Sequence, residues 1–168
     1  MDTIDTIMKN IVNLRIHIAP VGFEIDRIII PATSQKADKV WLIAHDNVSE
    51  DKAVKYREKI EKELEQKGIK TEVAYANRLR LFPIIKTVTD IILKERKNDV
   101  YVNVASGSKI HAIGCMMACM MFDDREKIHP FYARQKNILN MMEVYSKHTE
   151  WRRYIHFLHT ELEHRNLN

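Results

Sequence analysis

Short apolar runs of strand type recur along the chain, and longer segments with helical spacing separate them. Leu14, Ile16 and Ile18 alternate with Arg15 and His17, a pattern typical of a strand. Continuous apolar runs such as VWLIA are typical of strands buried on both faces of a sheet. The predicted strands are 14–20, 40–44, 69–75, 100–104 and 128–132.

Apolar residues at helical spacing fill the segments between these strands. Pro31 would kink or interrupt the helix after the first strand. Ser49 is expected to cap the next helix and Gly68 to end it, while Pro83 suits a first turn. The apolar helix from Ile110 is expected to be buried nearly all round, either in the core or at a subunit contact. Helical spacing also marks 4–11 and 138–162.

Strand and helix therefore alternate about four times, which favours an α/β fold. We expect a Rossmann-like, doubly wound, mainly parallel sheet of about five or six strands with right-handed crossovers, followed by a C-terminal helical extension. The expected division is a ligand-sensing domain over 1–134 and the extension over 135–168, packed on the domain or at a dimer contact. In such sheets ligands bind beyond the carboxyl ends of the strands.

Composition narrows the class of protein. The chain has 168 residues, 45% hydrophobic and 30% charged, which fits one domain with a proper core. The chain contains only 4 Gly and 4 Pro, and this low number argues against long linkers. The net charge of +4 and pI near 9.0 permit an anionic partner. Lys and Arg alternate with Asp and Glu, however, so a mixed solvated surface is the simplest interpretation.

The cysteines and the chain start predict a cytoplasmic protein. Cys115 and Cys119 would share a helix face where a disulfide is strained, so we expect reduced, buried thiols. The segment 1–13 lacks a signal-peptide pattern, and the longest apolar stretch, 110–122, is too short to cross a bilayer.

The segment NVASGSK, Asn103 to Lys109, suggests an anion site. Gly107 permits a tight turn, Ser106 and Ser108 add hydroxyls, and Lys109 adds a positive charge at a helix start. The segment matches neither GxxxxGK[ST] nor GxGxxG. A strand end followed by a capped helix would explain it without a ligand.

Two further loops are expected at the same edge of the sheet. The first strand is followed by Val21, Gly22, Phe23 and Glu24, and the second by His45 and Asp46. Three polar loops at one edge can together form a site.

Three motifs occur in order along the chain: RIHIAPVGFEIDRI (15–28), DKVWLIAHD (38–46) and DVYVNVASGSKIHAIGCMMACMMF (99–122). Together they resemble the CARF (CRISPR-associated Rossmann fold) domains, most closely an archaeal branch of CARF-like transcriptional regulators. The resemblance covers about residues 14 to 133.

The resemblance implies a homodimer that binds a cyclic oligoadenylate, commonly the four-membered ring, and regulates an antiviral or transcriptional response. Ser106 to Lys109 would hold ribose and phosphate, and Val21 to Glu24 would line the pocket near the adenines. No cofactor or metal is implied. Many CARF domains have Gly-Gly-Thr-Lys or Arg where this chain has Ser-Gly-Ser-Lys.

Two alternative functions remain open at this stage. Some relatives cleave the ring without metal, by attack of a ribose hydroxyl on its own phosphate. Lys109 would then stabilise the charge that develops on the phosphorane, and Ser106 would help to orient the reacting group. Relatives in the regulator branch usually carry a winged helix, for which 135–168 is too short. DNA binding is therefore expected only through a partner or a missing domain.

Several candidate residues also have a structural interpretation. Phe23 stacks on adenine or packs in the core. Glu24 meets a ribose hydroxyl, an adenine amine or Arg27. His45 with Asp46 is an acid–base pair or a strand-end turn, and Asn103 binds ligand or its own strand end. His156, His159 and Glu163 would share a helix face but lack a fourth ligand, so no metal site is predicted.

Overall fold

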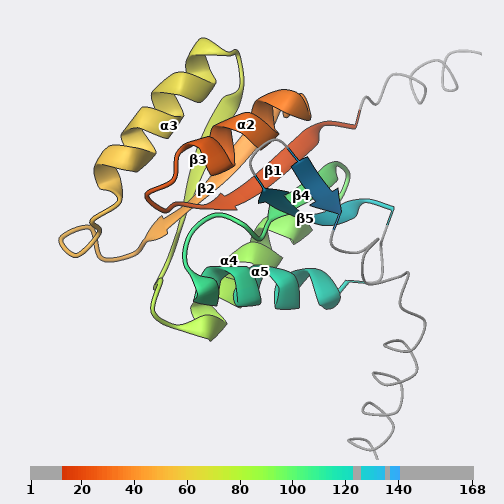
Figure 1. The fold of residues 1–168 in the computed structure, drawn as a ribbon. Coiled ribbons are helices and arrows are strands. Elements are labelled where there is room, and N and C mark those ends of the chain that lie inside the picture. The colour runs from red at the N-terminus through yellow and green to blue at the C-terminus, as the bar shows by residue number, and fades with distance from the viewer. Residues whose placement is uncertain (1–12, 123–125, 135–136, 141–168) are drawn as a thin grey trace, which may run out of the picture.

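The computed structural model describes residues 13–122, 126–134 and 137–140, and it forms a sheet with helices on both faces (Figure 1). Its elements in chain order are β1 (Arg15–Pro20), α2 (Asp26–Ser34), β2 (Lys39–His45), α3 (Val54–Gln66), β3 (Lys70–Ala76), α4 (Leu81–Lys94), β4 (Asp99–Asn103), α5 (Lys109–Met120), β5 (Ile128–Arg134) and β6 (Asn137–Asn140).

The sheet has the strand order β3-β2-β1-β4-β5-β6. Every pairing from β3 to β5 is parallel, and β6 pairs antiparallel with β5. The order reverses beside β1, so β1 and β4 are neighbours at the point where the crossovers change direction. The predicted Rossmann-like, mainly parallel sheet is confirmed.

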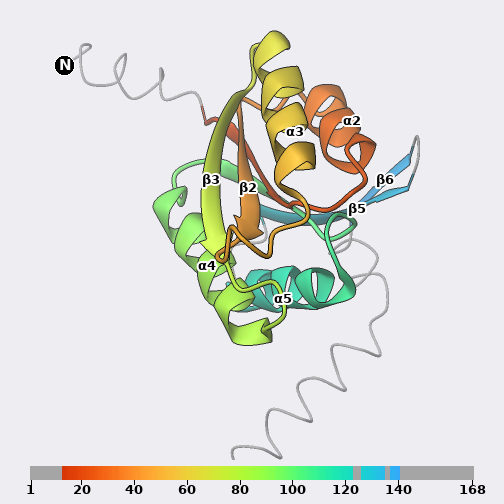
Figure 2. The ribbon, with the colours of Figure 1, turned by 90° about the vertical axis from the view of Figure 1, so that its left-hand side faces the viewer.

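Two apolar cores lie on opposite faces of the sheet. Figure 2 shows α2 and α3 over one face and α4 and α5 over the other. Along β2, Val40 and Leu42 pack beneath α2 and α3, whereas Trp41 and Ile43 pack on the side of α4 and α5. This alternation is why the run VWLIA is apolar throughout.

Three expectations about the helices can be compared with the structure. The helix α2 continues through Pro31 to Ser34, so Pro31 does not interrupt it. Ser49 does not cap a helix, because α3 begins at Val54 after Ala53, and the Ser49 hydroxyl instead donates to Asn47 Oδ1 over 2.7 Å. Residues 137–140, which helical spacing assigned to the extension, pair as β6. The predicted helices over 4–11 and from 141 onward lie outside the described residues.

The helix α5 has one face buried within the chain and one exposed face, so the core of this chain accounts for only part of the burial expected for it. Cys115 and Cys119 are buried and free, as expected. On the other side Ile113, Met117 and Met120 are each between 43% and 54% exposed. These three side chains, which we call the α5 apolar face, repeat at helical spacing.

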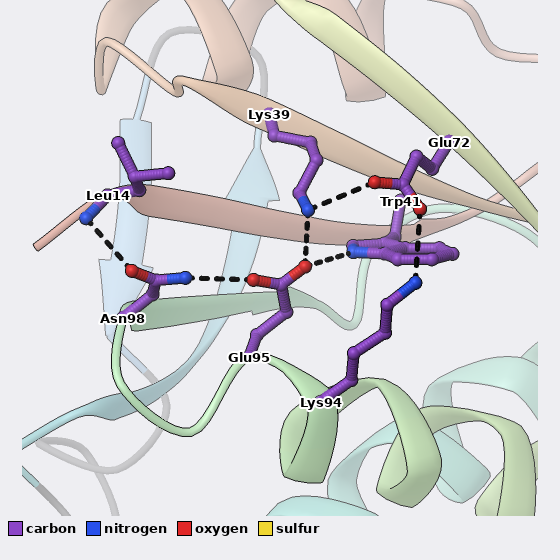
Figure 3. A network of polar contacts seen from close by, with 7 residues as sticks. All are labelled: Leu14, Lys39, Trp41, Glu72, Lys94, Glu95 and Asn98. Carbon is purple, nitrogen blue, oxygen red and sulfur yellow. Dashed lines mark hydrogen bonds and ion pairs between the residues drawn. The ribbon is translucent and has the colours of Figure 1, made fainter.

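At the amino-terminal edge of the sheet, Glu95 binds three donors (Figure 3). Its side chain pairs with the Lys39 ammonium and accepts hydrogen bonds from Trp41 Nε1 over 2.9 Å and Asn98 Nδ2 over 2.8 Å. Burial alone would raise the pKa of Glu95, but these three donors outweigh burial and lower it. The carboxylate therefore ties the end of α4 to β2.

Candidate functional site

The loops that follow β1 and β4 touch each other at the carboxyl edge of the sheet. A Cβ placed on Gly22 would lie 3.1 Å from Cα of Gly107 and 3.2 Å from its nitrogen. Gly107 itself has a φ of 74°, in the left-handed region that favours glycine. The two predicted rim loops are thus in backbone contact, and a side chain on either glycine would crowd that contact.

Asn103 organises the loop after β4 from within. Its Nδ2 donates to the carbonyl of Arg27 over 2.8 Å, and its Oδ1 accepts from the amides of Ala105 (2.9 Å) and Ser106 (3.2 Å). The residue is only 1% exposed. Its side chain therefore bonds its own strand end and the neighbouring helix, the structural alternative considered for it.

His111 closes the turn that leads into α5. The amide of Ser108 donates to His111 Nδ1 over 3.2 Å, and the amide of His111 donates to the Ser108 hydroxyl oxygen, so the two residues form a reciprocal cap. Burial, and then the charges of Arg78 and His45, lower the pKa of His111 to about 4. His111 is therefore neutral at pH 7, with Nδ1 as an acceptor and the proton on Nε2.

A cavity of about 530 Å³ opens beside these loops. Residues from four connecting segments and from the first turn of α5 line it: Val21, Gly22 and Phe23 after β1, Ala53 before α3, Arg78 and Leu79 after β3, Gly107 and Ser108 after β4, and Lys109, Ile110 and His111 in α5. Six of the eleven predicted site residues share this cavity: Val21, Gly22, Phe23, Gly107, Ser108 and Lys109.

The cavity combines positive charge with apolar surface. Lys109 and Arg78 line it and no carboxylate does. Within the described part of the chain, neither cation forms an ion pair. Phe23 and Leu79 are 57% and 70% exposed, and the Phe23 ring meets Tyr56 edge-on at 5.2 Å. A cavity with these walls can hold an anion that also carries flat apolar groups.

Glu24 lies outside this cavity. Its carboxylate pairs with Arg27, whose Nη1 donates to the carbonyl of Ala105 over 3.1 Å. The pair therefore braces the start of α2 against the loop after β4. This was one of the partners considered for Glu24 from the sequence.

His45, Asp46 and Ser106 are also absent from the cavity lining. His45 is buried, and its Nδ1 lies 2.9 Å from Oδ1 of Asp46 and 3.5 Å from the amide nitrogen of Arg78. The Arg78 amide donates to Nδ1, and the Asp46 carboxylate lies beside the same nitrogen. Ser106 is 3% exposed, and its hydroxyl has no hydrogen-bond partner among the described residues.

Arg78 and Leu79 were missed from the sequence. They belong to the segment NRLR, which follows β3 at the same edge of the sheet. The rule that selected the other loops, polar residues beyond the carboxyl end of a parallel strand, marks this segment as lying at the same edge of the sheet, although the rule alone does not place it at the β1–β4 junction.

Metal and membrane predictions can be compared with the described residues only. No cluster of metal-ligating side chains occurs among them, and His156, His159 and Glu163 lie outside them. Within the same residues, every helix falls short of the length and apolar character needed to span a membrane.

Comparison with known proteins gives a family and a fold. A family model described as "HFX_2341_N:-like, N-terminal" matches residues 15–138. An uncharacterized protein of Methanocaldococcus jannaschii, MJ1513, is 34% identical over 131 residues. The match covers 74% of this chain, which spans only 39% of that relative's length.

Solved structures with a similar fold include three that are described with a cyclic oligonucleotide. Can2 from Sulfobacillus thermosulfidooxidans, in complex with cyclic tetra-adenylate, has a TM-score of 0.61 at 14% identity, over 76% of this chain and 34% of its own. Enterococcus italicus Csm6, bound to a cyclic hexa-2'-fluoro-hexa-dAMP, has a TM-score of 0.58 at 11% identity, over 74% of this chain and 34% of its own. A type III CRISPR defence DNA nuclease activated by cyclic oligoadenylate has a TM-score of 0.58 at 16% identity, over 74% of this chain and 19% of its own. At these identities the likeness establishes the fold alone.

Proposed function

The chain belongs to the HFX_2341_N-like, N-terminal family, and we propose that it is a CARF-type sensor domain that binds a cyclic oligoadenylate, the four-membered ring, at the carboxyl edge of its sheet. The observation that carries this proposal is the cavity in which the loops after β1 and β4 meet beside Lys109, with no carboxylate in its lining. Phosphates need donors and positive charge, and adenines need apolar surface.

The lining supplies both kinds of contact. The Lys109 ammonium stands at the start of α5, where the helix end itself favours anions. Phe23 presents more than half of its surface and can stack on a base. Neighbours of the same fold are described with cyclic tetra-adenylate or a cyclic hexanucleotide analogue, which supports this class of ligand.

A homodimer is part of the proposal. A cavity of about 530 Å³ suits a ligand of drug size, about 300–1,000 Å³ by general experience, and a ring of four nucleotides is larger than such a ligand. Two cavities facing each other across a two-fold axis would enclose the ring. The α5 apolar face supports this arrangement, because it begins at Ile113, on the helix whose first turn lines the cavity.

Such a sensor would be cytoplasmic and would regulate an antiviral or transcriptional response through a partner or an attached domain. A ring-nuclease role receives no specific support from the site, because the Ser106 hydroxyl is buried and Ser106 does not line the cavity.

Calorimetric titration of the purified chain with cyclic tetra-adenylate tests the proposal. We expect one ring per two chains and at least about tenfold weaker binding for Lys109→Ala, since a hydrogen bond to a charged group contributes about 1.5–3 kcal/mol. Lys97→Ala is the control, because it removes an exposed lysine just beyond α4, at the opposite edge of the sheet. A folded wild-type chain that releases no heat would overturn the choice of ligand, and recovery of linear fragments would indicate an enzyme.

A further inference from the structure

We infer that the loop between β3 and α4 is a third wall of this site, in which Arg78 binds a phosphate of the ligand and Leu79 contacts one of its bases. The inference rests on the proposed function, because it assigns two further residues to the same cavity. Arg78 and Leu79 both line that cavity, beside Lys109 and Phe23.

The position of this loop is unexpected from topology alone. The strand β3 is at the edge of the sheet and is separated from β1 by β2. A loop at such an edge reaches the β1–β4 junction only if the helix after it leans toward that junction. In both views of the fold α4 and α5 lie on the same side of the sheet (Figures 1 and 2).

Gly114 accounts for the close approach of the two helices. A Cβ at this position would lie 2.7 Å from Cγ2 of Ile84 and 3.5 Å from Cδ1 of Leu81. Any side chain on Gly114 would therefore push the first turns of α4 away from α5. Because Gly114 has none, the start of α4 lies against α5, and the Arg78–Leu79 segment lies beside Lys109.

The loop is held in one conformation by Asn77. Its Oδ1 accepts from the amide of Leu79 over 3.1 Å, and its carbonyl accepts from the amide of Arg80 over 3.1 Å. On the inner side the Arg78 amide donates to Nδ1 of the buried His45 over 3.5 Å. Both side chains therefore extend from a fixed turn, which lowers the entropy lost on binding.

The charge of Arg78 is directed at the cavity. It contributes, after burial, to the lowered pKa of His111, another residue of the lining. Among the described residues no carboxylate pairs with Arg78. A guanidinium offers paired donors that match phosphate oxygens, so Arg78 and Lys109 can hold one phosphate, or two adjacent ones, from separate loops.

Leu79 completes the apolar part of the wall. It is 70% exposed, and the other strongly exposed apolar side chain of the lining is Phe23, from the loop after β1. Exposed leucines are ordinary when they stand alone, but this one shares a cavity with an exposed aromatic ring. A base placed in the cavity would remove both side chains from water.

The test is titration of the full chain with cyclic tetra-adenylate in four forms: wild type, Arg78→Ala, Arg78→Lys and Arg80→Ala. Arg80 is the matched control, since it carries the same charge two positions further along and does not line the cavity. We expect Kd to rise at least about tenfold for Arg78→Ala and to change less than about twofold for Arg80→Ala. Arg78→Lys should give an intermediate Kd, because it keeps the charge and loses the paired donors.

The outcomes separate the inference from the proposed function. If wild type binds and Lys109→Ala weakens binding at least about tenfold, but Arg78→Ala behaves like Arg80→Ala, the inference about the loop after β3 is wrong and the proposed sensor function is retained. If wild type does not bind, both fail. Thermal unfolding by circular dichroism identifies a variant that has lost its fold, and Arg78→Lys, which keeps the charge and most of the volume, then decides the question.

Discussion

A side chain on Gly107 would begin 2.8 Å from Cβ of Pro20, the last residue of β1. The same hypothetical Cβ would lie 3.0 Å from Nδ1 of His111. Gly107 is thus enclosed between the end of one strand and the cap of the helix that carries Lys109. Its small size keeps the two sides of the cavity at their present separation.

Gly107→Ala should destabilise the chain more than Gly68→Ala. Both glycines have a φ of 74°, so each substitution carries the left-handed strain of about 1–2 kcal/mol. Gly68 has no neighbour within 4 Å of an added Cβ, whereas Gly107 adds crowding of about 1–3 kcal/mol. Urea unfolding gives the difference, and only Gly107→Ala should also weaken binding of cyclic tetra-adenylate. Equal loss of stability in both variants would mean that the loop around Gly107 shifts to accommodate the added Cβ without a further loss of free energy of unfolding.

Glu95→Gln should lower the free energy of unfolding by about 3 kcal/mol, the low end expected when a buried charge loses its partner. All three contacts of Glu95 are donors, and an amide must turn its own NH₂ toward one of them. Glu72 still neutralises Lys39 over 3.1 Å, which limits the loss.

Asp90→Asn is the matched control for Glu95→Gln. It also changes an acid to its amide in or next to α4, but its partner Lys86 is 77% exposed and Asp90 itself 57%. A change within about 0.5 kcal/mol is expected there. Chemical denaturation of both variants at pH 7 checks the pair. A similar loss in the two would show that the Glu95 network contributes no more than a surface ion pair.

Stability should fall as the pH is lowered from about 6.5 to 4, and His17 should account for part of the fall. Burial, and then the charge of Arg15, lower the pKa of His17 from 6.5 to about 4. Between these pH values the histidine is protonated in the unfolded chain and neutral in the folded chain. Each such histidine therefore lowers the free energy of unfolding by about 1.4 kcal/mol for each unit by which the pH falls. Above about pH 6.5 the contribution is fully present.

His17→Phe should flatten this pH profile. The ring stacks on Tyr101 at 5.3 Å and meets Phe131 at 5.4 Å, a surrounding that suits phenylalanine. Because Nε2 of His17 has no hydrogen-bond partner among the described residues, the substitution removes no bond of that atom, and stability at pH 7.5 should be kept or raised. Urea midpoints from pH 4 to 7.5 measure the slope. An unchanged slope in the variant would assign the pH dependence elsewhere, first to His111.

Much of the fold could be predicted because the signal is local. Alternation around Ile16 and Ile18 places β1, and the apolar run of β2 reports burial on both faces. The Glu95 network has no such local signal. Lys39 and Trp41 lie 56 and 54 positions before Glu95, and the polar run ERKND reads as a solvated helix end. Its burial, 5% exposed, follows only from how α4 packs.

Part of the candidate site could likewise be predicted from the sequence, and part depends on tertiary packing. The loops after β1 and β4 are placed by strand order, so residues from Val21 to Phe23 and from Gly107 to Lys109 come together. His45 ends β2 and Asp46 follows it at the same edge, but neither residue lines the cavity, and His45 instead accepts a hydrogen bond from the amide of Arg78. Arg78 reaches the cavity through the contact of Gly114 with α4, which no pattern along the chain encodes.

The position of β1 between β2 and β4 also sets an order of folding. The amide of Arg15 bonds to Asp38, 23 positions later, whereas that of Leu14 bonds to Asn98, 84 positions later. Closing the longer loop costs about 1 kcal/mol more in chain entropy, so the β1–β2 ribbon is favoured first. Pairings of such long range also slow folding as a whole. The cavity is lined in part by the loop after β4 and by the start of α5, so it is complete only once these segments have docked, after β1, β2 and β3 have already been synthesised.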